Sequence, residues 1–518
     1  MTTNSKIARA SFILMSANAC VFLLGIAREV IVAARFGIRH EMDAFYAALT
    51  VPSVLSGILL STFSAVFIPV FLKQKTQNRE ESSRTISIAV NYFAALLFTI
   101  AALLFIFAPG IINLGFHGLT SETSELAARI LRALSFFFLF SSFSAVMMGI
   151  LNAHEKFAVP AFSSVIVVLS TIGFVLFAKG MGIFALVYGF VAGACIQMVV
   201  IIPFVFNEGY RYNASFSYKN PAVKTMLKNS IPYFFAIIIS ELNMVIGRTM
   251  ASYLSPGSIA SLGYADKLIS VPISIFSTSI ATAVFPYFSM QIAEQKVEEM
   301  KSSVASSIKM AGFILIPLTV MFVILGRPII EVLYQRGAFD AKAAGITSIV
   351  FICYSFQLFF YTSSTIMSRV FLVLQDIWAL LKVVALGLMS NLIFILIFTR
   401  VIHPSLAGIA LSASLASFVV MSLCFYFLGK KSMDFRRERI QGTVFRILLV
   451  SLIMGIAVFA LAGFYRDSGG VVCRFTRLVV LAAFGAAVFV ILSKLFGIEE
   501  LKKTERILLS KFPKRQAV

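Results

Sequence analysis

Long, almost uncharged runs of apolar residues recur along the whole chain of 518 residues. A helix needs about 20 mostly apolar residues to cross a bilayer, and the runs between charged or Gly/Pro breaks supply about 14 such segments. Lipid-facing barrel strands would alternate apolar and polar residues, and no such alternation is present. The sequence therefore predicts an all-α, polytopic membrane protein with about 14 transmembrane helices.

The composition agrees with this class. Hydrophobic residues make up 59% of the chain and charged residues only 13%, about half the charged share of a soluble domain. This excludes a cytosolic enzyme, a disordered chain and a nucleic-acid-binding module, because a soluble fold of this size could not cover so much apolar surface. The five Cys and four His are scattered, so no disulfide framework, metal site or cofactor is predicted.

The net charge of +21 is explained first by topology. Lys and Arg are concentrated in alternate loops, on the side that also holds both ends of a chain with an even number of spans. Cytoplasmic loops carry this excess, so both termini are predicted to be cytoplasmic.

The chain divides near its middle into two similar halves. The same number of residues separates Arg28 from Pro52 and Arg248 from Pro272, so each half has an arginine on its first helix and a proline on its second. Such parallel repeats are typical of two-lobed transporters with a central site. The predicted parts are an N-terminal lobe at 1–206, a cytoplasmic linker at 207–228, a second lobe at 229–430, two further helices at 431–496 and a basic amphipathic tail at 497–518.

Burying an ionisable residue in a membrane span costs free energy, so such residues are candidates for a functional site. They are Arg28, Glu29, Asp43, Glu241, Arg248, Asp266 and Lys267. Glu241 and Arg248 are seven residues apart, which puts them on one helical face, with Asn243 as a further polar group. Arg binds phosphate through a planar fork and Lys as a point charge, so Arg28, Arg248 and Lys267 together suit a pyrophosphate.

A purely structural role is an alternative for some of these residues. Glu29 and Asp43 can act as counterions for Arg28, and Glu241 can neutralise Arg248.

These residues and their surroundings resemble the MurJ/MviN lipid II flippase family, within the multidrug/oligosaccharidyl-lipid/polysaccharide exporter superfamily. The resemblance covers nearly the whole chain. Its motifs are Gly25-x-x-Arg28-Glu29, Ala34-Arg35-Phe36-Gly37, Asp43-Ala44-Phe45, Gly149-x-Leu151-Asn152-Ala153, Asn243, Arg248, Tyr264-Ala265-Asp266-Lys267, Arg336-Gly337-Ala338-Phe339 and Gln375-Asp376.

The resemblance implies two six-helix lobes around a cationic cavity and two C-terminal helices that form a groove for an undecaprenyl tail. It assigns Arg28 as the cavity arginine of the first helix and Asp43 as its acidic partner. It assigns Lys267 to the basic position of a motif in which the family carries arginine. It also implies a bacterial cytoplasmic membrane protein.

The chain departs from the family pattern on its second helix. The stretch 52–58 has no arginine, whereas the family carries a pair there, and Phe22 replaces another family arginine. The predicted cavity is therefore less cationic than the family pattern, so a different glycan lipid is an alternative substrate.

The leading hypothesis is a flippase that moves an undecaprenyl-pyrophosphate-linked peptidoglycan precursor, lipid II, across the membrane by alternating access. The driving force is left open between the membrane potential and a gradient of a monovalent cation. Two alternatives use the same scaffold: a flippase for another undecaprenyl-pyrophosphate-linked glycan, and a cation-coupled multidrug exporter. An enzyme is disfavoured, because acid/base chemistry would need more carboxylates or histidines on larger outer loops.

Overall fold

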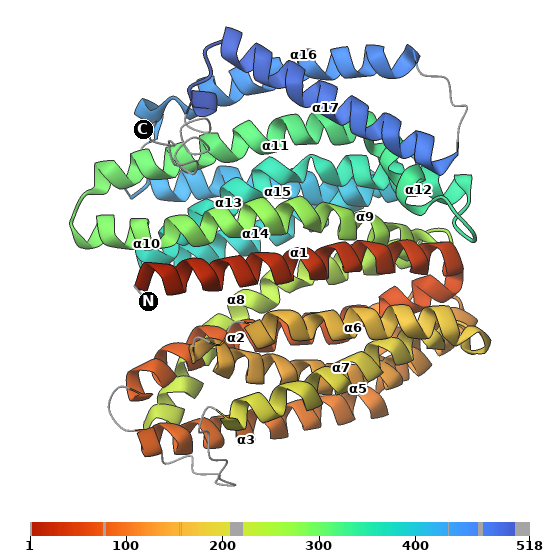
Figure 1. Ribbon diagram of the computed structural model, residues 1–518, viewed down its shortest axis with the longest axis vertical. Coiled ribbons are helices and arrows are strands. Elements are labelled where there is room, and N and C mark those ends of the chain that lie inside the picture. The colour runs from red at the N-terminus through yellow and green to blue at the C-terminus, as the bar shows by residue number, and fades with distance from the viewer. Residues whose placement is uncertain are drawn as a thin grey trace, which may run out of the picture. The chain divides into compact units, whose positions relative to one another are not determined.

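The computed structural model describes residues 3–75, 79–154, 156, 158–207, 221–431, 433, 435–464 and 470–502. These residues form helices and turns, with no strand among them (Figure 1). The helices are α1 (Thr3–Phe36), α2 (His40–Lys75), α3 (Arg79–Ile106), α4 (Ala108–Gly115), α5 (Ser121–Ala153), α6 (Ala158–Phe177), η1 (Lys179–Met181), α7 (Phe184–Asn207), α8 (Pro221–Ser252), α9 (Ser258–Pro272), η2 (Ile273–Thr278), α10 (Ser279–Ala293), α11 (Val297–Tyr334), α12 (Ala341–Ser355), α13 (Gln357–Val373), α14 (Ile377–Val401), α15 (Ser405–Gly429), η3 (Arg436–Glu438), α16 (Ile440–Phe464) and α17 (Val471–Leu495).

Many of these helices are long and apolar enough to cross a membrane. Within the described residues there are 11 such spans, or 12 if α3 and α4, which meet at an angle of 77°, count as one. Helices suit this environment because, away from their ends, backbone N–H and C=O groups find their partners inside the helix. The predicted all-α membrane class is confirmed, while the count of about 14 stays a prediction.

The chain folds into two compact units. Unit 1 contains Met1–Ala260 together with Arg336–Asp340, and unit 2 contains Ser261–Gln335 and Ala341–Val518. Helix α8, which begins inside the predicted linker at Pro221, therefore packs with unit 1. Most of that linker (208–220) and of the basic tail (503–518) lies outside the described residues, and the predicted lobe boundaries stay predictions.

Unit 1 is built around α5. Helices α2, α3 and α7 pack against it, α6 lies along α7, and α1 packs on α6 (Figure 1). One buried cluster joins α2, α3 and α5 through Leu59, Leu97, Leu104 and Phe138, with Leu97 and Phe138 fully shielded from solvent. These contacts hold α2 in place against the interior of the unit.

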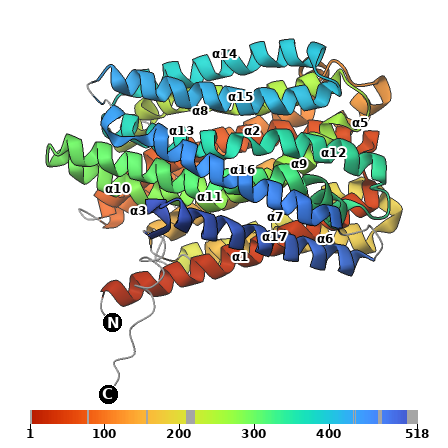
Figure 2. The same ribbon diagram turned by 90° about the horizontal axis from the view of Figure 1, so that it is seen from above.

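Unit 2 is organised around α11. Helices α12, α13, α16 and α17 contact it, and α14 lies beside α15 (Figure 2). Aromatic rings pack between α11 and two of its neighbours. Phe322 on α11 and Phe351 on α12 lie 4.9 Å apart between centroids, and Phe313 on α11 and Phe489 on α17 lie 5.2 Å apart.

The four residues of the predicted repeat lie on two pairs of consecutive helices. Arg28 lies in α1 and Pro52 in α2, and Arg248 lies in α8 and Pro272 in α9, as the sequence predicts. The backbone after the two prolines differs, however. Helix α2 continues as an α-helix, whereas Pro272 is followed by the six-residue π-helix η2. Short π-helical segments occur often at functional sites and let a long helix change direction.

The turn Arg336–Asp340 closes onto the end of α1. Ala338 N–H donates to the carbonyl of Ala34 at 2.7 Å. Gly37 and Gly337 both have positive φ, at 61° and 58°, and each lies so close to the opposite backbone that a Cβ would collide with a carbonyl oxygen. Glycine is required at both positions for conformation and for space.

Candidate functional site

A buried polar cluster of unit 1 lies where α2 faces α8 and the first residues of α9. Its charged members are Asp43 on α2 and Arg248 on α8, and both side chains are buried. Charged groups shielded from water must find partners, so their contacts define the site.

Arg248 is held by α2. Its Nη1 donates to Thr50 Oγ1 at 2.8 Å and to the carbonyl of Tyr46 at 3.3 Å. The guanidinium also lies 5.6 Å from the centroid of the Tyr46 ring, a cation–π distance. A guanidinium has five N–H donors, so Nε and Nη2 remain for another acceptor.

Asp43 caps the start of α9. Its carboxylate accepts the N–H of Gly257 at 2.5 Å and the N–H of Ala260 at 2.8 Å. The first N–H groups of a helix have no partner inside it, and a carboxylate also interacts favourably with the helix dipole there. Asp43 therefore ties α2 to α9 through the backbone.

The contacts between α2 and α8 follow one antiparallel register. Seven residues beyond Thr50, Gly57 faces Glu241, which lies seven residues before Arg248. A Cβ on Gly57 would lie 3.0 Å from Glu241 Oε1, so the glycine makes room for this carboxylate. The prediction that Glu241 and Arg248 share one helical face is consistent with both reaching α2, and no ion pair joins these two described residues.

Arg28 lies on α1 and has different partners. Its Nη2 donates to Glu29 Oε1 at 2.6 Å, and its guanidinium lies 5.1 Å from the centroid of the Phe190 ring on α7. Both side chains of the pair are largely buried, at 14% and 12% exposure. Glu29 is thus the counterion of Arg28, while Asp43 bonds to backbone.

The remaining predicted residues are less enclosed. Asn243 is half-buried on α8. Asp266 and Lys267 are exposed on α9, in unit 2. Within the described ranges, no group of three His, Cys, Asp or Glu is placed to hold a metal ion.

Sequence reasoning missed two members of the cluster, Tyr46 and Thr50. A threonine or tyrosine in an apolar helix gives no signal alone. The seven-residue spacing of Asp43, Thr50 and Gly57 marks one face of α2, and matched against Glu241 and Arg248 it would have found them.

Comparisons with known proteins identify the family. The model of the family described as "Lipid II flippase MurJ" matches residues 32–480. The chain belongs to the MurJ family. A probable lipid II flippase MurJ of Buchnera aphidicola subsp. Acyrthosiphon pisum is 26% identical over 84% of this chain and 86% of its own length. The lipid II flippase MurJ of Burkholderia cenocepacia is 23% identical over 79% of this chain and 81% of its own length.

Solved structures agree with the MurJ assignment. A structure titled "Lipid II flippase MurJ, inward closed conformation" matches with a TM-score of 0.78 and 25% identity, covering 94% of this chain and 98% of that one. An inward-facing MATE family multidrug resistance transporter shares the fold, with a TM-score of 0.67 and 15% identity over 82% of this chain and 95% of that one. MurJ is a flippase family, so the predictions of a transporter rather than an enzyme, and of a bacterial multi-pass inner-membrane protein, are confirmed.

Proposed function

We propose that this chain translocates lipid II across the cytoplasmic membrane by alternating access, with both termini in the cytoplasm. The proposal rests on the match of the MurJ family model to residues 32–480. Buried guanidinium groups in a helical membrane protein support it, because such charges are retained at a cost only where they act on a substrate or a conformational change.

The proposed substrate contacts are cationic. Arg28, Arg248 and Lys267 would bind the pyrophosphate, while the lipid tail stays in the bilayer. Arg248 has donors left over after its bonds to α2, and Arg28 would exchange Glu29 for phosphate oxygens. Glu241, Asn243 and Asp266 would line the surroundings.

The hydrogen bonds of Arg248 and Asp43 would hold the ends of α2, α8 and α9 together in a closed state. Asp43 and Arg248 hold α2 against two other elements, so opening of this end requires these bonds to break. A ligand that competes for Arg248 would weaken the closure, which couples binding to the change of state. Membrane potential or a monovalent cation is the proposed source of energy.

Complementation tests the proposal. The unmodified chain should restore growth to a strain depleted of its lipid II flippase, and Arg28→Ala and Arg248→Ala should fail to do so at equal membrane levels. Normal growth with both variants would refute the cationic site.

A second candidate is translocation of another undecaprenyl-pyrophosphate-linked glycan. It is favoured by the stretch 52–58, which lacks the family's arginines and has Gly57 beside Glu241. Failure of the unmodified, membrane-inserted chain to complement would favour this candidate. Dye efflux that depends on Asp43 would instead favour the multidrug exporter.

A further inference from the structure

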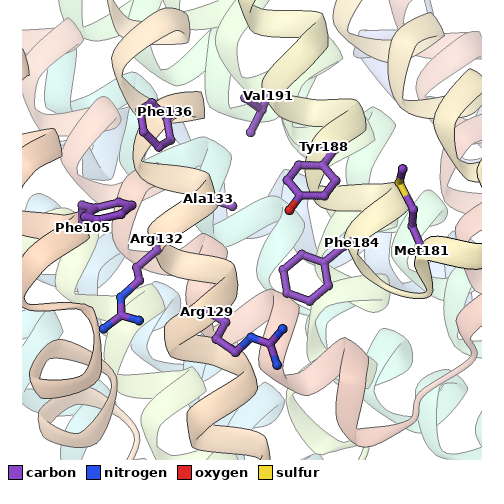
Figure 3. Close-up of a pocket in the computed structure, with 9 residues that line it drawn as sticks. All are labelled: Phe105, Arg129, Arg132, Ala133, Phe136, Met181, Phe184, Tyr188 and Val191. Atoms are coloured by element: carbon purple, nitrogen blue, oxygen red, sulfur yellow. The ribbon is translucent and has the colours of Figure 1, made fainter.

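A second arginine pair lies in a cavity of unit 1, and the proposed function does not use it. The cavity has a volume of about 610 Å³ and lies among α3, α5, η1 and α7 (Figure 3). Arg129 and Arg132 extend from α5, with Phe105 and Phe136 on one flank and Phe184 and Tyr188 on the other.

Neither guanidinium has an anionic partner among the described residues. Arg129 lies 5.5 Å from the centroid of the Phe184 ring. In the described part of the chain neither guanidinium makes a hydrogen bond or ion pair, and only the backbone carbonyl of Arg132 accepts a side-chain bond, from Ser135 Oγ. Glu125, one turn before Arg129, is exposed and does not pair with it. Two cations three residues apart repel each other, so a bound anion would relieve an unfavourable contact.

The depth of the arginines fits a lipid phosphate. The residues from Ala133 to Asn152 carry no charge, and these roughly 20 helical residues span about 30 Å, the thickness of the hydrocarbon core. Arg129 and Arg132 therefore lie where the hydrocarbon region meets the headgroups. On the proposed orientation this is the outer leaflet.

The walls fit the rest of a lipid. Phe105 and Phe136 are 44% and 47% exposed and contact each other edge to face, with 6.0 Å between centroids. These rings lie beside the arginines on the side toward the apolar run of α5, where acyl chains would continue from a headgroup. Tyr188, 43% exposed, supplies a hydroxyl on the opposite wall.

We propose that this cavity binds the phosphate headgroup of an anionic phospholipid from the bilayer. Two arginines bind phosphate oxygens through charge-assisted hydrogen bonds, and the aromatic walls contact the acyl chains. The site is separate from the proposed pyrophosphate contacts, since none of its lining residues belongs to that set.

A ligand-dependent stability measurement tests the site. The purified full chain in an uncharged detergent is titrated with dioctanoyl phosphatidylglycerol, and the thermal midpoint of unfolding reports binding. We expect the midpoint to rise, and the apparent affinity to fall at least tenfold in the double variant Arg129→Ala with Arg132→Ala. Arg129→Lys with Arg132→Lys should retain most of the affinity, because the charge is kept.

A matched control removes two exposed cations elsewhere. Arg474→Ala with Lys494→Ala, on α17, has the same loss of charge and should respond like the unmodified chain. Because all four side chains are exposed, these variants should fold, and the ligand-free midpoint verifies this. An unchanged phosphatidylglycerol response in the double Arg129/Arg132 alanine variant would overturn the proposal.

Further arms distinguish the ligand class. Dioctanoyl phosphatidylcholine should stabilise the chain less, because its headgroup has no net charge, and glycerol phosphate should not stabilise it at the same concentrations. An equal response to phosphatidylcholine would refute recognition of an anion. An equal response to glycerol phosphate that is lost in the double alanine variant would mean a site for soluble phosphates and would overturn the lipid assignment.

Discussion

Unit 1 contains two kinds of arginine at apolar helix surfaces. Arg248 is buried, and its Nη1 bonds to two acceptors on α2. Arg129 and Arg132 are exposed on the wall of a cavity, and their guanidinium groups bond to no acceptor in the described chain. The first arrangement uses part of the guanidinium to join two helices, whereas the second leaves every guanidinium donor open to a ligand.

The number of charges inside a membrane protein therefore says little about their roles. What matters is whether the protein itself supplies the partners. The effect of removing a charge should therefore follow its burial and its number of protein partners, and the following changes test that order.

Arg248→Ala should have the largest effect. It removes the Nη1 donor from Thr50 Oγ1 and from the Tyr46 carbonyl, which the Thr50 hydroxyl still reaches at 2.7 Å. Two hydrogen bonds to a charged group contribute about 3 kcal/mol. We expect a lower thermal midpoint and no complementation. Arg248→Lys should regain part of the stability. An Arg248→Ala variant as stable as the unmodified chain would show that the bonds of Arg248 to α2 do not stabilise unit 1.

Asp43→Asn should rank second. The amide keeps the size of the side chain but can accept only through one oxygen, so its NH2 group would face one of the two N–H donors at the start of α9. A loss of about 2 kcal/mol is expected from these charge-assisted bonds. Hydrogen exchange at Gly257 and Ala260 should accelerate, and unchanged protection of both amides would contradict the capping role.

Arg28→Ala should destabilise less, because only one ion pair is lost, but it should still abolish complementation. The unpaired Glu29 causes the destabilisation, so adding Glu29→Gln should restore the midpoint without restoring growth. Recovery of growth in the double variant would make Arg28 a structural residue.

The smallest effect is expected at the ion pair of Asp376 and Lys431, outside the spans of unit 2. The Lys431 hydrogen bond, then the Ala379 N–H, lower the pKa of Asp376. A lowered pKa stabilises the fold above the ordinary Asp value, and this contribution is lost as the pH falls through the lowered pKa. Asp376→Asn should flatten part of the acid-induced fall in thermal midpoint between about pH 5 and 2. An identical acid profile would show that the pair contributes nothing.

The sequence predicted the features that depend on composition and spacing. Apolar runs predicted the helices, and the equal separation of Arg28 from Pro52 and Arg248 from Pro272 predicted that each pair lies on two consecutive helices. The seven-residue spacing of Glu241 and Arg248 predicted their common face. Each of these follows from helix geometry and the cost of buried charge.

Other features depend on tertiary contacts and could not be predicted from the sequence. Asp43 has backbone N–H groups as partners, and any residue can supply those. The same proline context gives an α-helix after Pro52 and a π-helix after Pro272, because packing decides the outcome. Whether the guanidinium groups of Arg129 and Arg132 have protein acceptors depends on which side chains the tertiary structure places near them.

The turn Arg336–Asp340 has a consequence for the order of biosynthesis. Unit 1 is made of Met1–Ala260 and these five residues. The contact between Gly337 and Ala34 therefore cannot form until part of unit 2 has left the ribosome. At synthesis rates of about 5–20 residues per second, that interval is roughly 4–15 s. During this time the end of α1 lacks its cover, so truncation before the turn should give a first unit that is inserted but open to proteases there.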